Sequence, residues 1–396
     1  MSTRTLWQDI YAMEMDTGTD LITHVATNPS MDPAAKIGVL GTGSAEGKFS
    51  LPLTEHPSMN APSGTLDTEQ ARGISERHNR EFNTVQTGEP VEISVPMLGH
   101  AYNVSAMLAL LLQSGVSEAK NIDTAGFTRL SAIPYQLADV SHLAHFVRAL
   151  QPATGGKDID LLVKGAICTE LELSAEAGGL LNMTAMIRGS NWAEINLGTG
   201  GLGVTNNLLN GFDTIVPLKY QDSTIAIWDS AGSAWVEVFS PNISFTITNN
   251  ALFNYYNSNT AASIHLGRIG ISGSITIPYS QATVGENYMI HRFLEGEPVK
   301  LAWFWGQGGA TKDIARDHKL NSADFSINPI DRYKNDSSAT NPKNFFSIVT
   351  NQRVTDYEMV GENEIQVECT LEAVTDETTP AVEIFCLYDS ALLARL

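Results

Sequence analysis

The sequence is poor in cysteine and in basic residues, and it has no long apolar run. Its three cysteines, Cys168, Cys369 and Cys386, stand far apart and fit no metal or redox spacing, which indicates folding in a reducing, cytosolic environment. The longest apolar run, residues 106–112, is about a third of the length of a membrane-spanning helix. The N-terminal residues also lack the apolar core of a signal peptide. We therefore expect a soluble protein that is neither embedded in a membrane nor secreted by the usual route.

The shortage of basic residues leaves a strongly acidic chain. Lys and Arg number 24 against 44 Asp and Glu, so the net charge is −20. A protein that grips nucleic acid presents a basic face, because Lys and Arg displace the counterions of phosphate. This composition therefore excludes a role in gripping DNA, although it leaves open a place beside DNA without adhesion.

Length and composition predict a β-rich protein of two domains. The chain has 396 residues, of which 43% are apolar and 17% charged, which is enough for two well-buried cores. Glycine is plentiful, with 32 residues, and polar turn residues recur between short apolar runs. This pattern favours many strands and turns over long helices.

An order of strand then helix occurs twice along the chain. Residues 91–96 and 274–278 have strand character, and residues 103–114 and 284–295 follow them as predicted amphipathic helices. Pro96 and Met107 lie in the first copy, and Pro278 and Met289 lie at matching places in the second. We interpret the match as an internal duplication.

A hairpin follows in each copy. Residues 167–173 and 181–187 alternate apolar and polar side chains around a glycine turn at 176–179, and residues 347–357 and 365–371 do so around a turn at 360–363. The Gly- and Asn-rich stretch 191–207 between the copies has the composition of a linker. We therefore predict two related domains, residues 1–200 and 201–396.

Two more segments carry predictions. Residues 56–80 are polar with few apolar anchors, which predicts a long exposed loop or a hairpin ordered only by a partner. Residues 137–150 place apolar side chains along one face of an amphipathic helix.

Motifs for chemistry are weak. Residues 36–43 resemble a dinucleotide-binding glycine loop, but a strand-like segment follows where a helix is required. His142 and His145 lie one helical turn apart without a further ligand, which favours surface histidines over a metal site. The aromatic run 303–305 favours packing or an interface over a sugar site. We predict no catalytic residue, no cofactor and no metal.

Glutamates occupy the polar side of both hairpins. They alternate with buried-type residues in the strands, which by itself indicates only a half-exposed sheet. A solvated sheet face and a wall of glutamates facing a channel both fit this pattern. The candidate residues are Glu170, Glu172, Glu364, Glu368 and Glu372.

The repeated order of strand, helix, strand and hairpin resembles the tail tube proteins of long-tailed bacteriophages. The resemblance is best over residues 162–190 and good over residues 269–387, and it covers about two thirds of the chain. It implies a mainly β fold of two related tail-tube-like β-sandwich or barrel domains, each with a flanking α-helix.

The resemblance also implies a function. Subunits would join their sheets edge to edge into rings, and stacked rings would form a tube that conducts DNA from capsid to host. The glutamates would then line the lumen, where like charge lets DNA pass without sticking. Because two tube-like halves lie in one chain, three copies, rather than six, would close a ring with pseudo-sixfold symmetry.

The implied partners and location follow from that role. They are further copies of the chain, the tape measure protein, the tail terminator, and baseplate or tip proteins, in a virion assembled in the host cytoplasm. Two alternatives stay open: a baseplate hub or other injection-tube component, and an enzyme or binding module on a β-sandwich.

Overall fold

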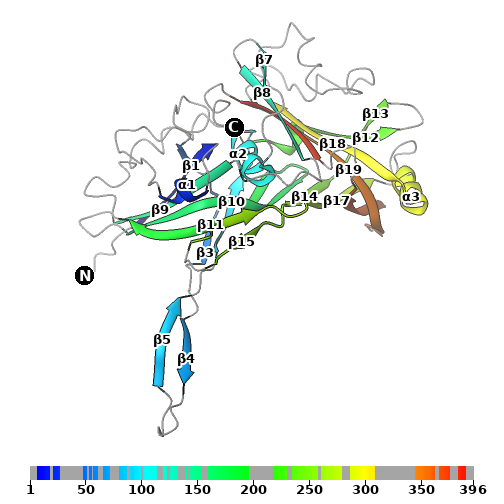
Figure 1. Cartoon of the computed structure of the whole chain (residues 1–396). Helices are drawn as coiled ribbons and strands as arrows, with labels where there is room; N and C mark the ends of the chain where they lie inside the picture. The colour runs from blue at the N-terminus through cyan, green and yellow to red at the C-terminus, as the bar shows by residue number, and fades with distance from the viewer. Residues whose placement is uncertain are drawn as a thin grey trace, which may run out of the picture.

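The computed structural model describes the chain in segments, and the text below concerns these alone. They are residues 7–17, 21–26, 48–50, 53–55, 57–60, 66–71, 80–86, 90–99, 101–113, 119–122, 125–132, 140, 142–152, 159–195, 217–229, 234–256, 260–278, 286–307, 344–361, 365–374 and 382–388. Most of these residues lie in antiparallel strands, with three short helices beside them (Figure 1). The expected mainly β fold is confirmed.

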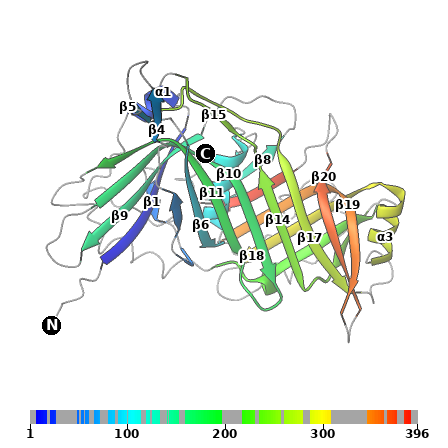
Figure 2. The ribbon, with the colours of Figure 1, turned by 90° about the horizontal axis from the view of Figure 1, so that it is seen from below.

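One eight-stranded antiparallel sheet runs through both halves of the chain (Figure 2). The first half supplies four neighbouring strands and the second half supplies the next four. In spatial order the strands are β3 (Ser58–Asn60), β6 (Val91–Leu98), β11 (Asn182–Ile195), β10 (Ile159–Glu176), β14 (Asn242–Thr248), β17 (Gly270–Pro278), β20 (Gln366–Ala373) and β19 (Asn344–Val360). Apolar residues alternate toward the interior in strands such as β6, β14 and β20, which favours strands over helices there.

The two longest strands also take part in a second layer. The first part of β10 pairs with β9, which continues through β1 to β2, and the first part of β19 pairs with β18 and β21. From there β18 leads to β12 and β13, and β21 leads to β8 and β7. The strands are β1 (Trp7–Thr17), β2 (Lys48–Ser50), β7 (Ala119–Ile122), β8 (Ala125–Ala132), β9 (His142–Pro152), β12 (Ser223–Asp229), β13 (Ala234–Val238), β18 (Pro298–Gln307) and β21 (Val382–Tyr388).

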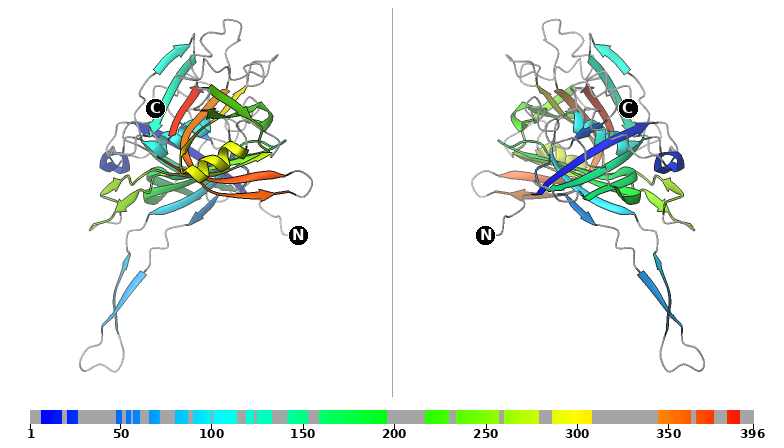
Figure 3. Two further views of the ribbon diagram at one scale, coloured as in Figure 1. Left: turned by 90° about the vertical axis from the view of Figure 1, so that its right-hand side faces the viewer. Right: turned by 90° about the vertical axis from the view of Figure 1, so that its left-hand side faces the viewer.

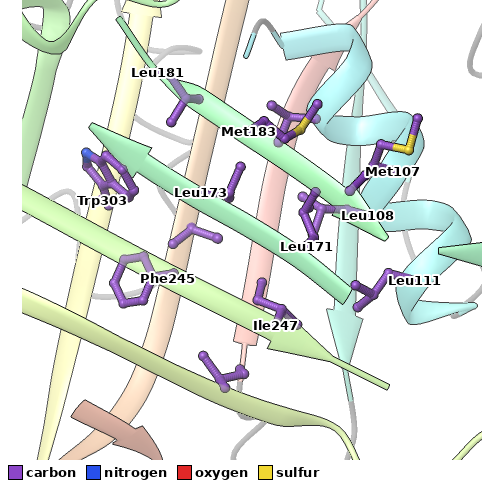
Figure 4. Close-up of a cluster of buried hydrophobic side chains, with 14 of the residues drawn as sticks. Met107, Leu108, Leu111, Leu171, Leu173, Leu181, Met183, Phe245, Ile247 and Trp303 are labelled. Carbon is purple, nitrogen blue, oxygen red and sulfur yellow. The ribbon is translucent and has the colours of Figure 1, made fainter. Parts of the chain in front are cut away.

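The core lies between the layers (Figure 4). Leu171 and Leu173 of β10 and Phe245 of β14 face Trp303 of β18, and all four side chains are fully buried. The rings of Phe245 and Trp303 are 5.7 Å apart, centroid to centroid. Trp303 and Trp305 are both buried, so these two side chains of the aromatic run pack in the core, as the sequence favoured.

Three short helices accompany the strands: α1 (Leu21–Ala26), α2 (Ala101–Leu112) and α3 (Glu286–Glu295). The two predicted helices are confirmed in α2 and α3 with small shifts of their ends. Met107 and Met289 are both fully buried, as their matching positions predict. However, α2 is buried along most of its described length, whereas α3 leaves Leu294 69% exposed. A single 3₁₀ turn, η2 (Tyr220–Asp222), precedes β12.

The predicted helix over residues 137–150 is wrong, because this segment contains β9. Residues His142 to Phe146 are all buried, since β9 pairs with β1 on one edge and β10 on the other and both of its faces are covered there. A strand with two buried faces loses the alternation that identifies it, so helical spacing matches by accident. His142 and His145 are each 3% exposed and are not surface histidines.

The polar segment 56–80 contains β3 and most of a separate hairpin. Strands β4 (Leu66–Ala71) and β5 (Arg80–Gln86) pair only with each other among the described strands, and this arm extends away from the rest of the fold (Figures 1 and 3). In the second half a shorter hairpin, β15 (Leu252–Asn254) with β16 (Ser263–His265), takes the same place in chain order.

The two halves share one core and one sheet. Strands β10 and β14 pair across the midpoint of the chain, and β21 returns to pair with β8. Residues 196–216 lie outside the described residues, and with them most of the proposed boundary. The division into domains of residues 1–200 and 201–396 therefore stays a prediction.

Candidate functional site: an acidic sheet face

Most side chains on the outer face of the eight-stranded sheet are polar. Directly paired residues of neighbouring strands share a face, so the register connects Glu172 of β10 with Thr246 of β14, and Thr246 with Ser272 of β17. Ser272 in turn pairs with Glu372 of β20. The glutamates of the two halves therefore lie on one side of one continuous sheet.

Four of the five candidate glutamates are placed by the structure. Glu170, Glu172, Glu368 and Glu372 are exposed on this outer face. Glu364 lies outside the described residues, so its position is not assigned. The opposite face of the same strands carries Leu171, Val367, Leu371 and other core residues.

The face holds further acidic residues that the sequence analysis did not single out. They are Glu176, Asp356 and Glu358, all exposed. The alternation of β19 is interrupted at Thr355, where the pairing with β20 shifts by one residue. This bulge reverses which positions face outward, and it concealed Asp356 and Glu358. Counting the alternation back from the turn at 360–363 instead would have found them.

The face carries two arginines, but its carboxylates outnumber them and it stays strongly acidic. Arg188 forms an ion pair with Glu92 at 2.7 Å, and Arg353 lies directly across from Glu372. Glu358 pairs directly with Glu368, and like charges in cross-strand positions are destabilising. The folded monomer gains no stability from placing Glu358 beside Glu368. A function of the acidic face beyond the folding of the monomer is therefore the simpler explanation.

The buried thiols are unsuited to chemistry at neutral pH. Cys168 and Cys369 are free and buried. Burial, with a smaller effect from the charge of Glu368, raises the pKa of Cys369 to about 12. Burial also raises the pKa of Cys168. A thiol held in its neutral form is neither a nucleophile nor a metal ligand.

Among the described residues, no group of three or more His, Cys, Asp or Glu side chains is arranged to hold a metal ion. In the same part of the chain, the helices are too short or too polar to cross a bilayer. The glycine-rich segment 36–43 lies outside the described residues. The acidic face is therefore the feature to which a function is best assigned.

A family model and a solved structure of phage tail tube proteins are similar to this chain. A family model described as "Phage tail tube protein" matches residues 28–343. Among solved structures, the tail tube of SPP1, determined by solid-state NMR and cryo-electron microscopy, is similar at 10% identity over 45% of this chain and 84% of that chain, with a TM-score of 0.28. A TM-score this low does not by itself assign a shared fold. The curated protein sequences contain no significant match.

Proposed function

The chain belongs to the phage tail tube protein family, and we propose that three copies of it close each ring of the tube with the acidic sheet face toward the lumen. A structural component of a virion needs no catalytic centre. The observation that carries the lumen assignment is the continuity of the face, which runs without interruption from Glu170 and Glu172 to Glu368 and Glu372.

The acidic face suits passage of DNA without adhesion. Phosphates carry negative charge along the whole duplex, so a wall of exposed carboxylates repels it and offers no counterions to release. At physiological salt, screening limits this repulsion to about 8 Å. DNA would therefore be held off the wall only at short range and would slide along the axis.

The repeated strand order supports three copies per ring. Each chain supplies two sets of four strands in the same order, so three chains supply the six sets of a pseudo-sixfold ring. We further propose that the tube contacts the tape measure protein inside, the tail terminator at one end and baseplate or tip proteins at the other, and that it assembles in the host cytoplasm.

Electron microscopy of the purified chain at high concentration tests the tube. We expect hollow tubes or stacked rings, because no described strand pairs with the outer edge of β3 or with the last part of β19. End views should show six density lobes, and the mass of an isolated ring should correspond to three chains. A mass of six chains would contradict the three-copy ring. Single rings that never stack would favour a baseplate hub or another injection-tube component.

Thiol labelling tests which face lines the lumen. In Glu172→Cys tubes, a small maleimide should react, whereas a maleimide carried on a large polymer should react only after the tubes are dissociated. The native Cys168 and Cys369 contribute little background because they are buried. The control is Ile22→Cys, at an exposed position of α1. Its reaction with the polymer maleimide is measured in tubes and in dissociated chains. Equal reaction of Glu172→Cys with the polymer reagent in tubes and in dissociated chains would place the acidic face outside.

A further inference from the structure

The strand pairings of the first half recur in the second with the same register. Pro96 of β6 pairs with Thr184 of β11, and Pro278 of β17 pairs with Gln366 of β20, at the same separation along the chain. Strand β3 lies beside β6 as β14 lies beside β17. Each half thus presents one set of four strands in the same order.

A similar local irregularity occurs in both long strands, displaced by two residues relative to the match of Pro96 with Pro278. Both β10 and β19 carry a one-residue bulge at a threonine, Thr169 in the first and Thr355 in the second. Each threonine hydroxyl donates to a carbonyl of the partner strand, Thr169 to Met186 at 3.2 Å and Thr355 to Thr370 at 3.3 Å. The two long strands are therefore structural counterparts.

Inside the chain, β14 covers the second edge of β10. The contact runs antiparallel from Glu170 with Thr248 to Glu176 with Asn242. Backbone bonds at its two ends, from Asn249 N–H to Thr169 O and from Ala177 N–H to Pro241 O, show that alternate residues of β10 face β14. This junction joins the two halves into one sheet.

The equivalent edge of β19 has no strand partner among the described residues. In that position the backbone N–H of Tyr357 donates to the carboxylate of the preceding Asp356 at 2.9 Å. Figure 3 shows the β19–β20 hairpin, in orange, projecting past the rest of the sheet. At the other end of the sheet, β3 pairs only with β6 within the described part. Among the described strands, the sheet thus ends in two unpaired edges that correspond to the two sides of the internal junction.

Apolar side chains near the free edge of β19 are exposed, although their counterparts are buried. Met359 is 55% exposed, whereas the two leucines of β10 in the matching region, Leu171 and Leu173, are 0% exposed. Ile365 is 53% exposed and its counterpart Met183 is 1% exposed. The first hairpin is covered by the second half of the chain, whereas no described strand pairs with the corresponding edge of the second hairpin.

A groove of about 420 Å³ lies beside this unpaired part of β19. It is lined by Thr355, by residues 370–373 and by the ends of β14 and β17. In the first half the corresponding place is filled by the chain that follows β14: Ala261 N–H donates to Ser190 O at 3.2 Å, and the hydroxyl of Tyr255 donates to the same oxygen at 3.1 Å.

We propose that β3 of a second copy pairs antiparallel with the free edge of β19 at its Val360 end, with its β4–β5 arm directed toward the groove. The contact reproduces the β10–β14 junction between chains. In a ring of three, internal and external junctions would then alternate around six equivalent positions. The inference rests on the proposed ring and specifies which edges form it.

The edge can be blocked without breaking the hairpin. By the alternation above, the N–H of Met359 faces the free edge and not β20, so Met359→Pro removes an intermolecular donor only. Met359→Asp instead places a charge on the apolar contact. We expect both variants to remain monomeric by light scattering and to form no tubes, with a far-UV spectrum and melting temperature close to those of the monomeric native chain. Ile22→Asp, at a side chain 72% exposed on α1 far from β19 (Figures 1 and 2), should still form tubes.

Disulfide trapping gives a positive readout that does not depend on loss of assembly. Val360→Cys chains are mixed with Ser58→Cys, Met59→Cys or Asn60→Cys chains and oxidised mildly after tube formation. Antiparallel neighbours bring Cα atoms within disulfide range, so at least one pair should give a covalent heterodimer, and no single variant alone should. Tubes formed by Met359→Pro, or tubes without any heterodimer, would overturn the β3–β19 contact and leave the tube function standing. Failure of the native chain to form any ring would instead count against the proposed function.

Discussion

Replacing Trp303 with alanine is expected to lower the free energy of unfolding by about 3–5 kcal/mol. The indole is fully buried between the two sheet layers, with its ring centroid 3.7 Å from that of Trp305 and 5.7 Å from that of Phe245. Truncation leaves a cavity that strands held by ladders on both sides cannot close. Chemical denaturation of the dissociated chain, followed by tryptophan fluorescence and circular dichroism, measures the loss.

Phe239 provides the matched control for Trp303. Its side chain is 68% exposed, so Phe239→Ala removes an aromatic ring without opening the core. We expect a change within about 0.5 kcal/mol. If Trp303→Ala were no more damaging than Phe239→Ala, the two layers would not pack as described.

Replacing Asn249 with alanine is the second large expected effect, at roughly 2–4 kcal/mol. This side chain is 1% exposed, and its amide donates to Leu111 O of α2 and to Cys168 O of β10, each at 2.9 Å. Its own oxygen accepts the N–H of Ala251 at 3.2 Å. Truncation leaves two carbonyls of the first half without this donor, so the junction between the halves is weakened.

Asn249→Asp sharpens this test because it keeps the shape and replaces the donor by an acceptor. Burial raises the pKa of the introduced carboxyl above its unfolded value, so folding takes up a proton. The loss relative to the native chain is therefore largest at neutral pH and shrinks as the pH falls through that raised pKa. Asn254→Ala, on the partly exposed β15, where the amide donates to Ser263 Oγ at 3.2 Å, should cost less than about 1 kcal/mol. Equal losses in the two alanine variants would contradict the role given to Asn249.

These two sites show where sequence reasoning succeeds and where it stops. The burial of Trp303 and Trp305 follows from their alternation in a strand, so the sequence favoured it. Nothing near Asn249 in the sequence marks it, because its two acceptors lie in α2 and β10, far away along the chain. Partners at that separation are set by the pairing of β10 with β14, which no local pattern encodes.

For the acidic face too, the sequence predicted one part and the tertiary structure decided the other. Alternation in each hairpin placed Glu170 and Glu172 on one side of their strand, and Glu368 and Glu372 on one side of theirs. That these two sides coincide depends on the register through β14 and β17. One residue of slip at either strand would have put the two pairs on opposite faces.

By itself, the sequence determined the strand-rich composition, the repeated order of strand, helix and hairpin, and the side of each hairpin that faces water. These properties depend on side-chain periodicity over a few residues. Only the tertiary structure decided that 142–152 is a strand, that both halves share one sheet, and that β3 and β19 are the end strands of this sheet among the described strands. Strand pairing joins residues that are far apart in the sequence, so a local pattern does not predict it. In β9, burial on both faces also removes the alternation of apolar and polar residues by which a strand is predicted.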